Sequence, residues 1–208
     1  MSELSVSKRW AWLSLAIAIQ CIYIPTSLAT SGGIAPKLSI DVIPVYPVWI
    51  VPYCFAYFFW LFCMYWALYK LDDRSFRAGL AGALLTVSVG AATFVFFPTY
   101  INLPLVTGDD IFSQSLRLMQ VASGTHAALP SAHNYMTMLF VAFAMRLYPK
   151  RRWLWIVILV SIALSTLFTG QHYILDVVTG LALGWAGYKF GWFFLERSEH
   201  GLAAHPPS

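Results

Sequence analysis

Residues 48–69 read VWIVPYCFAYFFWLFCMYWALY, a run of 22 residues without a charged side chain. A helix needs roughly 20 mostly apolar residues to cross the hydrocarbon core of a bilayer, because each residue adds only about 1.5 Å. This stretch therefore predicts a membrane-spanning helix. The composition agrees, since 59% of the 208 residues are hydrophobic and 11% are charged, whereas a soluble domain carries about 25% charged residues. The mean hydropathy is +0.68.

Five other segments have a similar length and apolar character. Together with residues 48–69 they predict an all-α integral membrane bundle of six transmembrane helices. The predicted spans are Trp10–Leu28, Val48–Tyr69, Ala78–Phe97, Pro130–Tyr148, Trp153–Thr169 and His172–Leu195. Residues 1–196 are predicted to form one six-helix transmembrane domain, and residues 197–208 a mobile cytoplasmic tail.

Lysine and arginine residues are distributed unevenly between the segments that connect these spans. With the N-terminus inside, eleven of the 13 lie on the cytoplasmic side, and only Lys37 and Arg117 lie outside. This positive-inside bias predicts a multi-pass protein of the cell membrane with both termini in the cytoplasm. The basic residues stand in short clusters between apolar runs, so the net charge of +4 indicates topology and not a nucleic-acid partner.

Two long outer segments, residues 29–47 and 98–129, are rich in proline and glycine. Loops of this length in a compact domain are usually functional or disordered. In the second, Phe112, Leu116 and Met119 follow a helical spacing, which predicts a short helix over residues 110–121 that lies along the membrane surface.

Three ionisable residues fall at membrane depth, where such groups are costly and therefore indicate function: His133, His172 and Asp176. Asp176 follows His172 by four positions, so the carboxylate can orient the imidazole from the same helix face. The short connection through residues 170–171 places His172 near the membrane level of His133. Two facing imidazoles fit an in-line displacement at phosphorus, in which His172 attacks and His133 protonates the departing oxygen. Water or an alcohol then takes the phosphoryl group, and no metal or other cofactor is required.

The residues before His133 predict a site for an anion. Pro130 suits the first turn of a helix, because its missing N–H group has no partner there in any case. The free N–H groups of Ser131, Ala132 and His133 then point outward and can bind phosphate.

These residues resemble the signature motifs of a known family. The segment Pro130-Ser131-Ala132-His133 is similar to the second motif of the type 2 phosphatidic acid phosphatase superfamily. Ser165, followed by His172 and Asp176, is similar to the third. The pairs Ser165-Thr166 and His172-Tyr173 most resemble the inositol phosphorylceramide synthase branch.

The resemblance covers most of the chain and implies an enzyme that acts on a phospholipid or prenyl (di)phosphate at the extracytoplasmic face. It implies a phosphohistidine intermediate without a metal. By resemblance, His172 is the nucleophile, Asp176 its orienting carboxylate, His133 the acid and Ser131 a phosphate ligand.

Two arginines of the family pattern are absent from this chain. Thr166 stands where the phosphatases usually carry an arginine, and Leu103 stands before Pro104, where the first motif has another. The charge of the phosphate then has to be offset by outer basic residues, and this departure favours transfer from a phosphodiester or diphosphate over hydrolysis of a monoester. The candidates are Lys37, Arg117 and His126.

Plainer interpretations of the same residues stay open. The polar trio can be a structural cluster between helices, and Ser131 can be only a helix cap. Asn134 and Gln171 adjoin the histidines and are predicted to bind the phosphate, but they can also satisfy backbone groups. Asp41 is interpreted as a brace of its proline-rich loop. The many aromatic residues are interpreted as lipid-facing bulk and interfacial belts.

The chain is therefore predicted to be a membrane lipid phosphatase or phosphotransferase whose lipid phosphate substrate enters from the bilayer. A headgroup transferase of the inositol phosphorylceramide synthase type is the alternative within this class, because only the attacking group differs. A non-catalytic protein that binds or transports lipid phosphates is the alternative from another class. An ion-conducting bundle is disfavoured, since the polar residues gather at one level instead of lining a path.

Overall fold

The structure, a computed structural model, describes residues 3–29 and 31–204. Within these ranges the secondary structure is helical, without a strand, and two isolated β-bridges join loop residues. This confirms the predicted all-α class. The α-helices are α1 (Val6–Gln20), α2 (Tyr23–Ser27), α3 (Ile50–Tyr69), α4 (Asp73–Phe96), α5 (Ile111–Ser123), α6 (Ala132–Leu147), α7 (Arg152–Phe168) and α8 (Ile174–Ala204). Short 3-10 helices at Pro47–Trp49 and Pro149–Arg151 precede α3 and α7.

Four helical stretches are long and apolar enough to cross a membrane, which supports a membrane protein. They are Val6–Ser27, Pro47–Tyr69, Asp73–Phe96 and Pro149–Phe168. Helix α6, with 16 residues, and helix α8 are outside this group. Both pack against other helices of the bundle, and α8 also leaves large apolar side chains exposed, among them Val178, Trp185 and Phe193. The number of six spans therefore stays a prediction.

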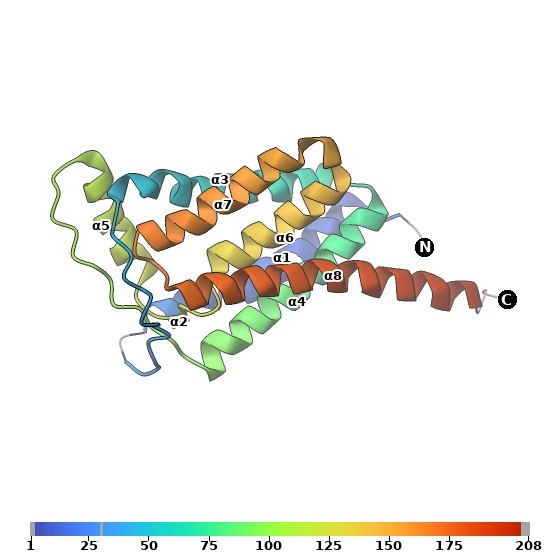
Figure 1. Cartoon of the computed structure of the whole chain (residues 1–208). Coiled ribbons are helices and arrows are strands. Elements are labelled where there is room, and N and C mark those ends of the chain that lie inside the picture. Colours follow the sequence, from blue (N-terminus) through green and yellow to red (C-terminus); the bar gives the residue numbers. More distant parts are fainter. Residues whose placement is uncertain (1–2, 30, 205–208) are drawn as a thin grey trace.

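The long helices run side by side, and Figure 1 shows α5 gathered at one end of the bundle with the long loops that precede α3 and flank α5. The first turn of α1 and the last turns of α8 lie at the opposite end. Helix α8 packs along both α4 and α6, and α6 also packs against α7. The start of α6, the end of α7 and the start of α8 consequently meet at the end that carries α5 and the long loops.

Glycine residues on α8 allow this close packing. A Cβ atom at Gly180 would lie 2.7 Å from the carbonyl oxygen of Ser131, and one at Gly187 would collide with the hydroxyl of Thr86. Small residues let helix backbones approach closely inside a membrane. The start of α8 is thereby held directly against the start of α6.

The first predicted span is divided into two helices. Helix α1 ends at Gln20, and α2 follows after a turn at Cys21. The buried Arg9 anchors α1 to the end of α3, because its guanidinium donates to backbone carbonyls there, the shortest bond being 2.8 Å to Leu71. Carbonyl groups at a helix C-terminus carry partial negative charge, so a buried cation is stabilised at this position.

A helix forms in the outer segment for which the sequence predicts one. Helix α5 begins after Asp110, whose carboxylate accepts the backbone N–H groups of Phe112 and Ser113 at 2.9 and 3.1 Å. Leu116 is fully buried beside Ile50 of α3. That α5 lies along a membrane surface stays a prediction.

The predicted C-terminal tail begins inside α8, because this helix continues through Ala204. Residues 205–208 lie outside the described residues. The boundary after residue 196, the mobility of the tail and its cytoplasmic location stay predictions.

Candidate active site

The candidate active site is built around the first turn of α8. Asp176 lies in this turn, and its Oδ2 atom accepts the backbone N–H of Tyr173 at 2.8 Å. A carboxylate is favoured there, because it satisfies a free N–H group at the positive end of the helix. The same oxygen lies 3.4 Å from Nδ1 of His172, so the expected contact is present. Asp176 is fully buried, and its capping bond fixes the carboxylate beside the imidazole.

His172 does not begin the last helix, as the sequence predicts, but precedes α8 by two residues. Its backbone N–H donates to the carbonyl oxygen of Thr166 at 3.1 Å, and so does that of Gln171. The turn contains Gly170 with φ +66°, a conformation that glycine adopts without strain. The end of α7 therefore fixes the main chain on which His172 stands.

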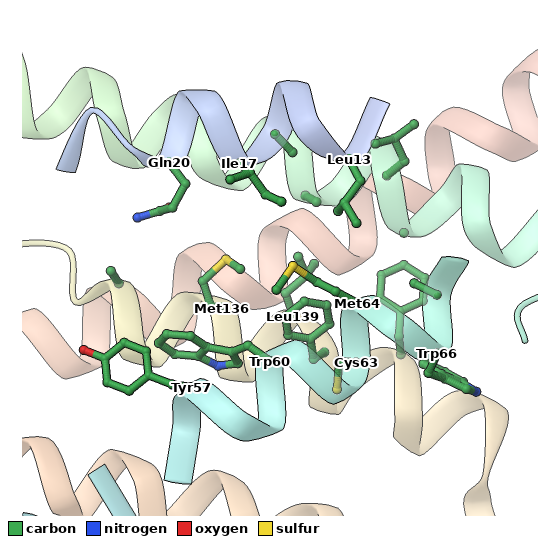
Figure 2. A pocket seen from close by; sticks show the side chains of 18 of the residues that line it. Leu13, Ile17, Gln20, Tyr57, Trp60, Cys63, Met64, Trp66, Met136 and Leu139 are labelled. Carbon is green, nitrogen blue, oxygen red and sulfur yellow. The ribbon is translucent and has the colours of Figure 1, made fainter. Parts of the chain in front are cut away.

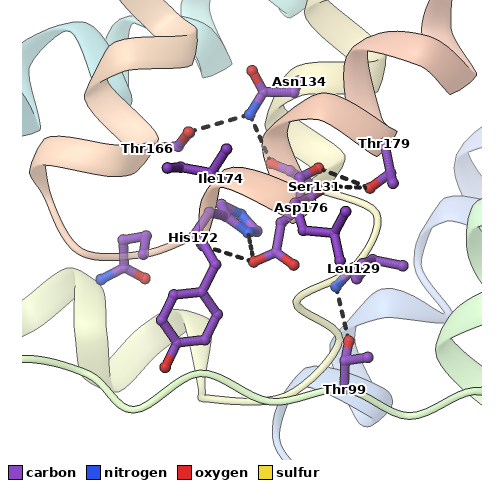
Figure 3. A network of polar contacts seen from close by, with 12 residues as sticks. Thr99, Leu129, Ser131, Asn134, Thr166, His172, Ile174, Asp176 and Thr179 are labelled. Atoms are coloured by element: carbon purple, nitrogen blue, oxygen red, sulfur yellow. Dashed lines mark hydrogen bonds and ion pairs between the residues drawn. The ribbon is translucent and has the colours of Figure 1, made fainter. Parts of the chain in front are cut away.

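Hydrogen bonds join the start of α6 to α7 and α8 (Figure 3). The backbone N–H of Ser131 donates to the backbone carbonyl of Asp176 at 3.0 Å. The amide of Asn134 donates to Oγ of Ser131 at 2.9 Å and to Oγ1 of Thr166 at 3.2 Å. All four residues are fully buried, so these bonds are shielded from solvent.

The predicted anion site at the start of α6 is wrong in one respect. The sequence predicts three free N–H groups, but that of Ser131 is occupied by Asp176. Pro130 precedes the N-cap residue Ser131 instead of occupying the first turn. The Ser131 side chain makes no capping bond to the backbone. The N–H groups left for an anion are those of Ala132 and His133.

His133 is enclosed by aromatic residues of α3. Its ring stacks on Tyr53 with 4.1 Å between ring centroids, and the rings of Tyr57 and Trp60 lie at 5.2 and 5.0 Å. These three side chains are therefore site neighbours and not only the lipid-facing bulk that the sequence indicates. His133 is 7% exposed, and its Nε2 atom has no hydrogen-bond partner among the described residues.

Buried polar atoms without a partner are concentrated at this place. Of six such side-chain atoms in the described part of the chain, four belong to His133, Asn134, Gln171 and Asp176. Because native proteins satisfy nearly all buried polar groups, this concentration indicates a site that a polar ligand completes. No group of three or more His, Cys, Asp or Glu residues within residues 3–29 and 31–204 is arranged to hold a metal ion.

Two hollows border the two histidines. A polar pocket of about 160 Å³ is lined by His172 together with Lys37, Asp41 and Asn102 and by apolar loop residues. His133 lines a larger apolar cavity of about 330 Å³ between α1, α3, α4 and α6. The nucleophile candidate thus borders polar surroundings, and the acid candidate borders apolar ones.

Asp41 has a role that sequence reasoning missed. Its Oδ2 atom accepts the N–H of Leu38 at 2.7 Å, as expected of a loop brace. Its Oδ1 atom also accepts the N–H of Ile174, the first residue of α8, at 2.8 Å. Asp41 therefore ties the loop that carries Lys37 to the helix that carries Asp176.

The three candidate cations differ in position. Lys37 lines the polar pocket with His172. Arg117 donates to the carbonyl oxygens of Val106 and Gly108 at 3.1 and 2.6 Å. The ring nitrogens of His126 bond to Thr125 and to the carbonyl of Gly32 at 3.0 and 3.1 Å. The structure thus brings Lys37 to the site, whereas the bonds described for Arg117 and His126 brace the loops.

A family model described as the PAP2 superfamily matches residues 30–190, which include all candidate site residues. The chain belongs to the PAP2 superfamily. Membership of the PAP2 superfamily indicates a phosphatase-type enzyme, with phosphatase or phosphotransferase activity, and the four apolar helices agree with a membrane location. Comparison with curated proteins and with solved structures gave no match.

Proposed function

We propose that this PAP2 superfamily protein is a membrane-embedded enzyme that cleaves or transfers the phosphoryl group of a phospholipid or prenyl (di)phosphate. The reaction takes place at the extracytoplasmic face through a phosphohistidine on His172. The observation that supports this most is the fixed carboxylate of Asp176, fully buried and 3.4 Å from Nδ1 of His172. Such a carboxylate keeps the ring proton on Nδ1 and leaves the lone pair of Nε2 for attack.

In the proposed first step, Nε2 of His172 forms a bond to phosphorus while the bond from phosphorus to the leaving oxygen breaks. His133 donates a proton to that oxygen, and Asp176 stabilises the imidazolium of His172. In the second step, His133 removes a proton from water or an alcohol, whose oxygen then displaces His172 from phosphorus. The backbone N–H groups of Ala132 and His133 and the ammonium of Lys37 offset the charge on the phosphoryl oxygens.

A second candidate is a phosphodiester headgroup transferase of the inositol phosphorylceramide synthase type. The polar pocket of about 160 Å³ beside His172 favours it, because Lys37, Asp41 and Asn102 offer hydrogen bonds to a headgroup or an acceptor alcohol. The resemblance of Ser165-Thr166 and His172-Tyr173 to that branch supports the same candidate.

The test is turnover by the purified protein in detergent. Phosphatidate, diacylglycerol diphosphate, prenyl diphosphates and phosphoinositides are offered with and without acceptor alcohols, and phosphate release and transfer products are measured. We expect turnover that disappears in His172→Ala while lipid binding is retained. Binding without turnover of any of these lipids by the unaltered protein would instead favour the non-catalytic lipid-phosphate binding or transport protein.

Two further measurements address the metal and the membrane face. Activity is expected to survive EDTA, because imidazole and backbone groups carry the proposed reaction; a loss that magnesium restores contradicts this. In a variant without its three cysteines, a cysteine placed between residues 98 and 129 is expected to react with an impermeant reagent on intact cells. Labelling only after permeabilisation would reverse the proposed topology.

A further inference from the structure

The apolar cavity beside His133 extends away from the site into the bundle (Figure 2). Its lining along α6 runs from His133 to Phe143, and along α3 from Tyr57 to Ala67. Each stretch covers ten residue steps, or about 15 Å at a rise of about 1.5 Å per residue. This is about half of the roughly 30 Å hydrocarbon core, which is the depth of one leaflet.

The polarity of the lining changes along this length. Polar groups lie at the end next to the site, where Gln20, Tyr57 and His133 line the cavity. The Oε1 atom of Gln20 accepts the hydroxyl of Tyr135 at 2.6 Å, so this end is held by a hydrogen bond between α1 and α6. The far end is lined by apolar side chains, among them Leu71, Phe76 and Phe143. A cavity that is polar at one end and apolar along its length complements an amphiphile.

The size of the cavity limits what it can hold. Its volume of about 330 Å³ is near the lower end of the range of about 300–1,000 Å³ for ligand sites. A volume of this size suits one extended hydrocarbon chain and is too small for both chains of a diacyl lipid.

We propose that this cavity binds one hydrocarbon chain of the substrate, with the phosphate-bearing end at His133 and the chain end toward Phe76 and Phe143. This inference rests on the proposed function and adds the orientation of the lipid substrate between the two histidines. Since His133 borders the apolar cavity, the oxygen that it protonates is on the lipid side of the broken phosphorus–oxygen bond. The phosphate or headgroup stays on the side of His172 and the polar pocket.

Gly79 on α4 offers a direct test, because it lines the cavity and a Cβ atom built there meets no heavy atom within 4 Å. Leucine at this position extends into the cavity without displacing backbone. Ser88 on the same helix is exposed and does not line the cavity. Ser88→Leu therefore adds the same side chain outside the cavity and is the matched control.

The experiment measures kcat/KM on lipid phosphates of increasing chain length for the unaltered protein, Gly79→Leu and Ser88→Leu. We expect Gly79→Leu to lower kcat/KM for long chains about tenfold or more, because at least two methylene groups lose their burial. For short chains we expect it to stay within about twofold, as for Ser88→Leu at all lengths. An equal effect of Gly79→Leu on short and long chains overturns the chain site, whereas turnover of short chains shows that the proposed function itself stands.

A binding measurement decides the question without turnover. Phosphatidate with a photoreactive group at the end of one chain is bound to the purified protein, irradiated, and mapped by mass spectrometry. We expect labelling of far-end residues such as Met64 and Phe143, and competition by unlabelled phosphatidate. Labelling confined to the lipid-facing surface overturns the proposal. Equal, uncompeted labelling by a photoreactive chain without phosphate also overturns it, because the cavity then holds bulk lipid.

Discussion

Replacing Asp176 with asparagine separates two contributions of this carboxylate, the cap of α8 and the negative charge beside His172. Oδ2 accepts the backbone N–H of Tyr173 at 2.8 Å and lies 3.4 Å from Nδ1 of His172. Asparagine keeps an oxygen for the Tyr173 N–H, so the first turn of α8 stays capped. It removes the negative charge that stabilises the imidazolium of His172 and fixes its tautomer.

The expected losses of rate and of stability follow from these two bonds. A hydrogen bond to a charged group contributes about 1.5–3 kcal/mol, which corresponds to roughly 10–150-fold in rate. We therefore expect Asp176→Asn to lower kcat on the order of 10²-fold. Because the cap is kept, the free energy of unfolding should change by less than about 1 kcal/mol, whereas Asp176→Ala loses the cap and about 1 kcal/mol more.

The assay combines initial rates of phosphate release from phosphatidate with thermal unfolding in the same detergent. Both variants should lose activity, but only Asp176→Ala should lose clear stability. Activity of Asp176→Asn within about threefold of the unaltered protein would show that His172 does not depend on the carboxylate charge. Equal destabilisation of the two variants would show that the lost activity reflects the fold and not the chemistry.

Three other substitutions test the packing that positions the site. Asp41→Ala removes the acceptor of two backbone N–H groups, so the free energy of unfolding should fall by about 1–2 kcal/mol, and kcat/KM should fall as well. Asp41→Asn should retain most of the stability and most of the activity, as measured by thermal unfolding and initial rates. Gly187→Leu forces a side chain onto the hydroxyl of Thr86 and should cost about 3 kcal/mol or more, seen as loss of monodisperse protein in gel filtration. Arg9→Met removes the donors to the carbonyls at the end of α3 and should cost about 1–3 kcal/mol with kcat unchanged below the unfolding temperature. A lowered kcat in folded Arg9→Met protein would contradict its placement away from the site.

Helix α3 illustrates what the sequence predicts well. The apolar run Val48–Tyr69 becomes a 3-10 turn followed by the helix Ile50–Tyr69, because length and hydropathy suffice to identify it. Helix α4 begins at Asp73, five residues before the predicted start at Ala78. Its cap Asp72 accepts the N–H of Ser75 at 2.8 Å. Charged residues in this first turn resemble a loop when only hydropathy is considered.

In the candidate site, too, contacts between residues close in sequence are predictable, whereas contacts between distant segments are not. The contact between His172 and Asp176 follows from their spacing of four residues, although the reason differs in part, since Asp176 caps the helix that His172 precedes. The bond from Ile174 to Asp41 spans 133 positions, and no local pattern reports it. The aromatic enclosure of His133 likewise comes from another helix and depends on tertiary packing.

The bond between the amide of Ser131 and the carbonyl of Asp176 consists of main-chain atoms alone. Replacing a side chain at His133, His172 or Asp176 deletes neither partner, so inert variants should preserve the alignment of the two segments. The His172→Ala variant is for that reason suited to structure determination, by crystallography or cryo-EM, with an unreacted lipid bound.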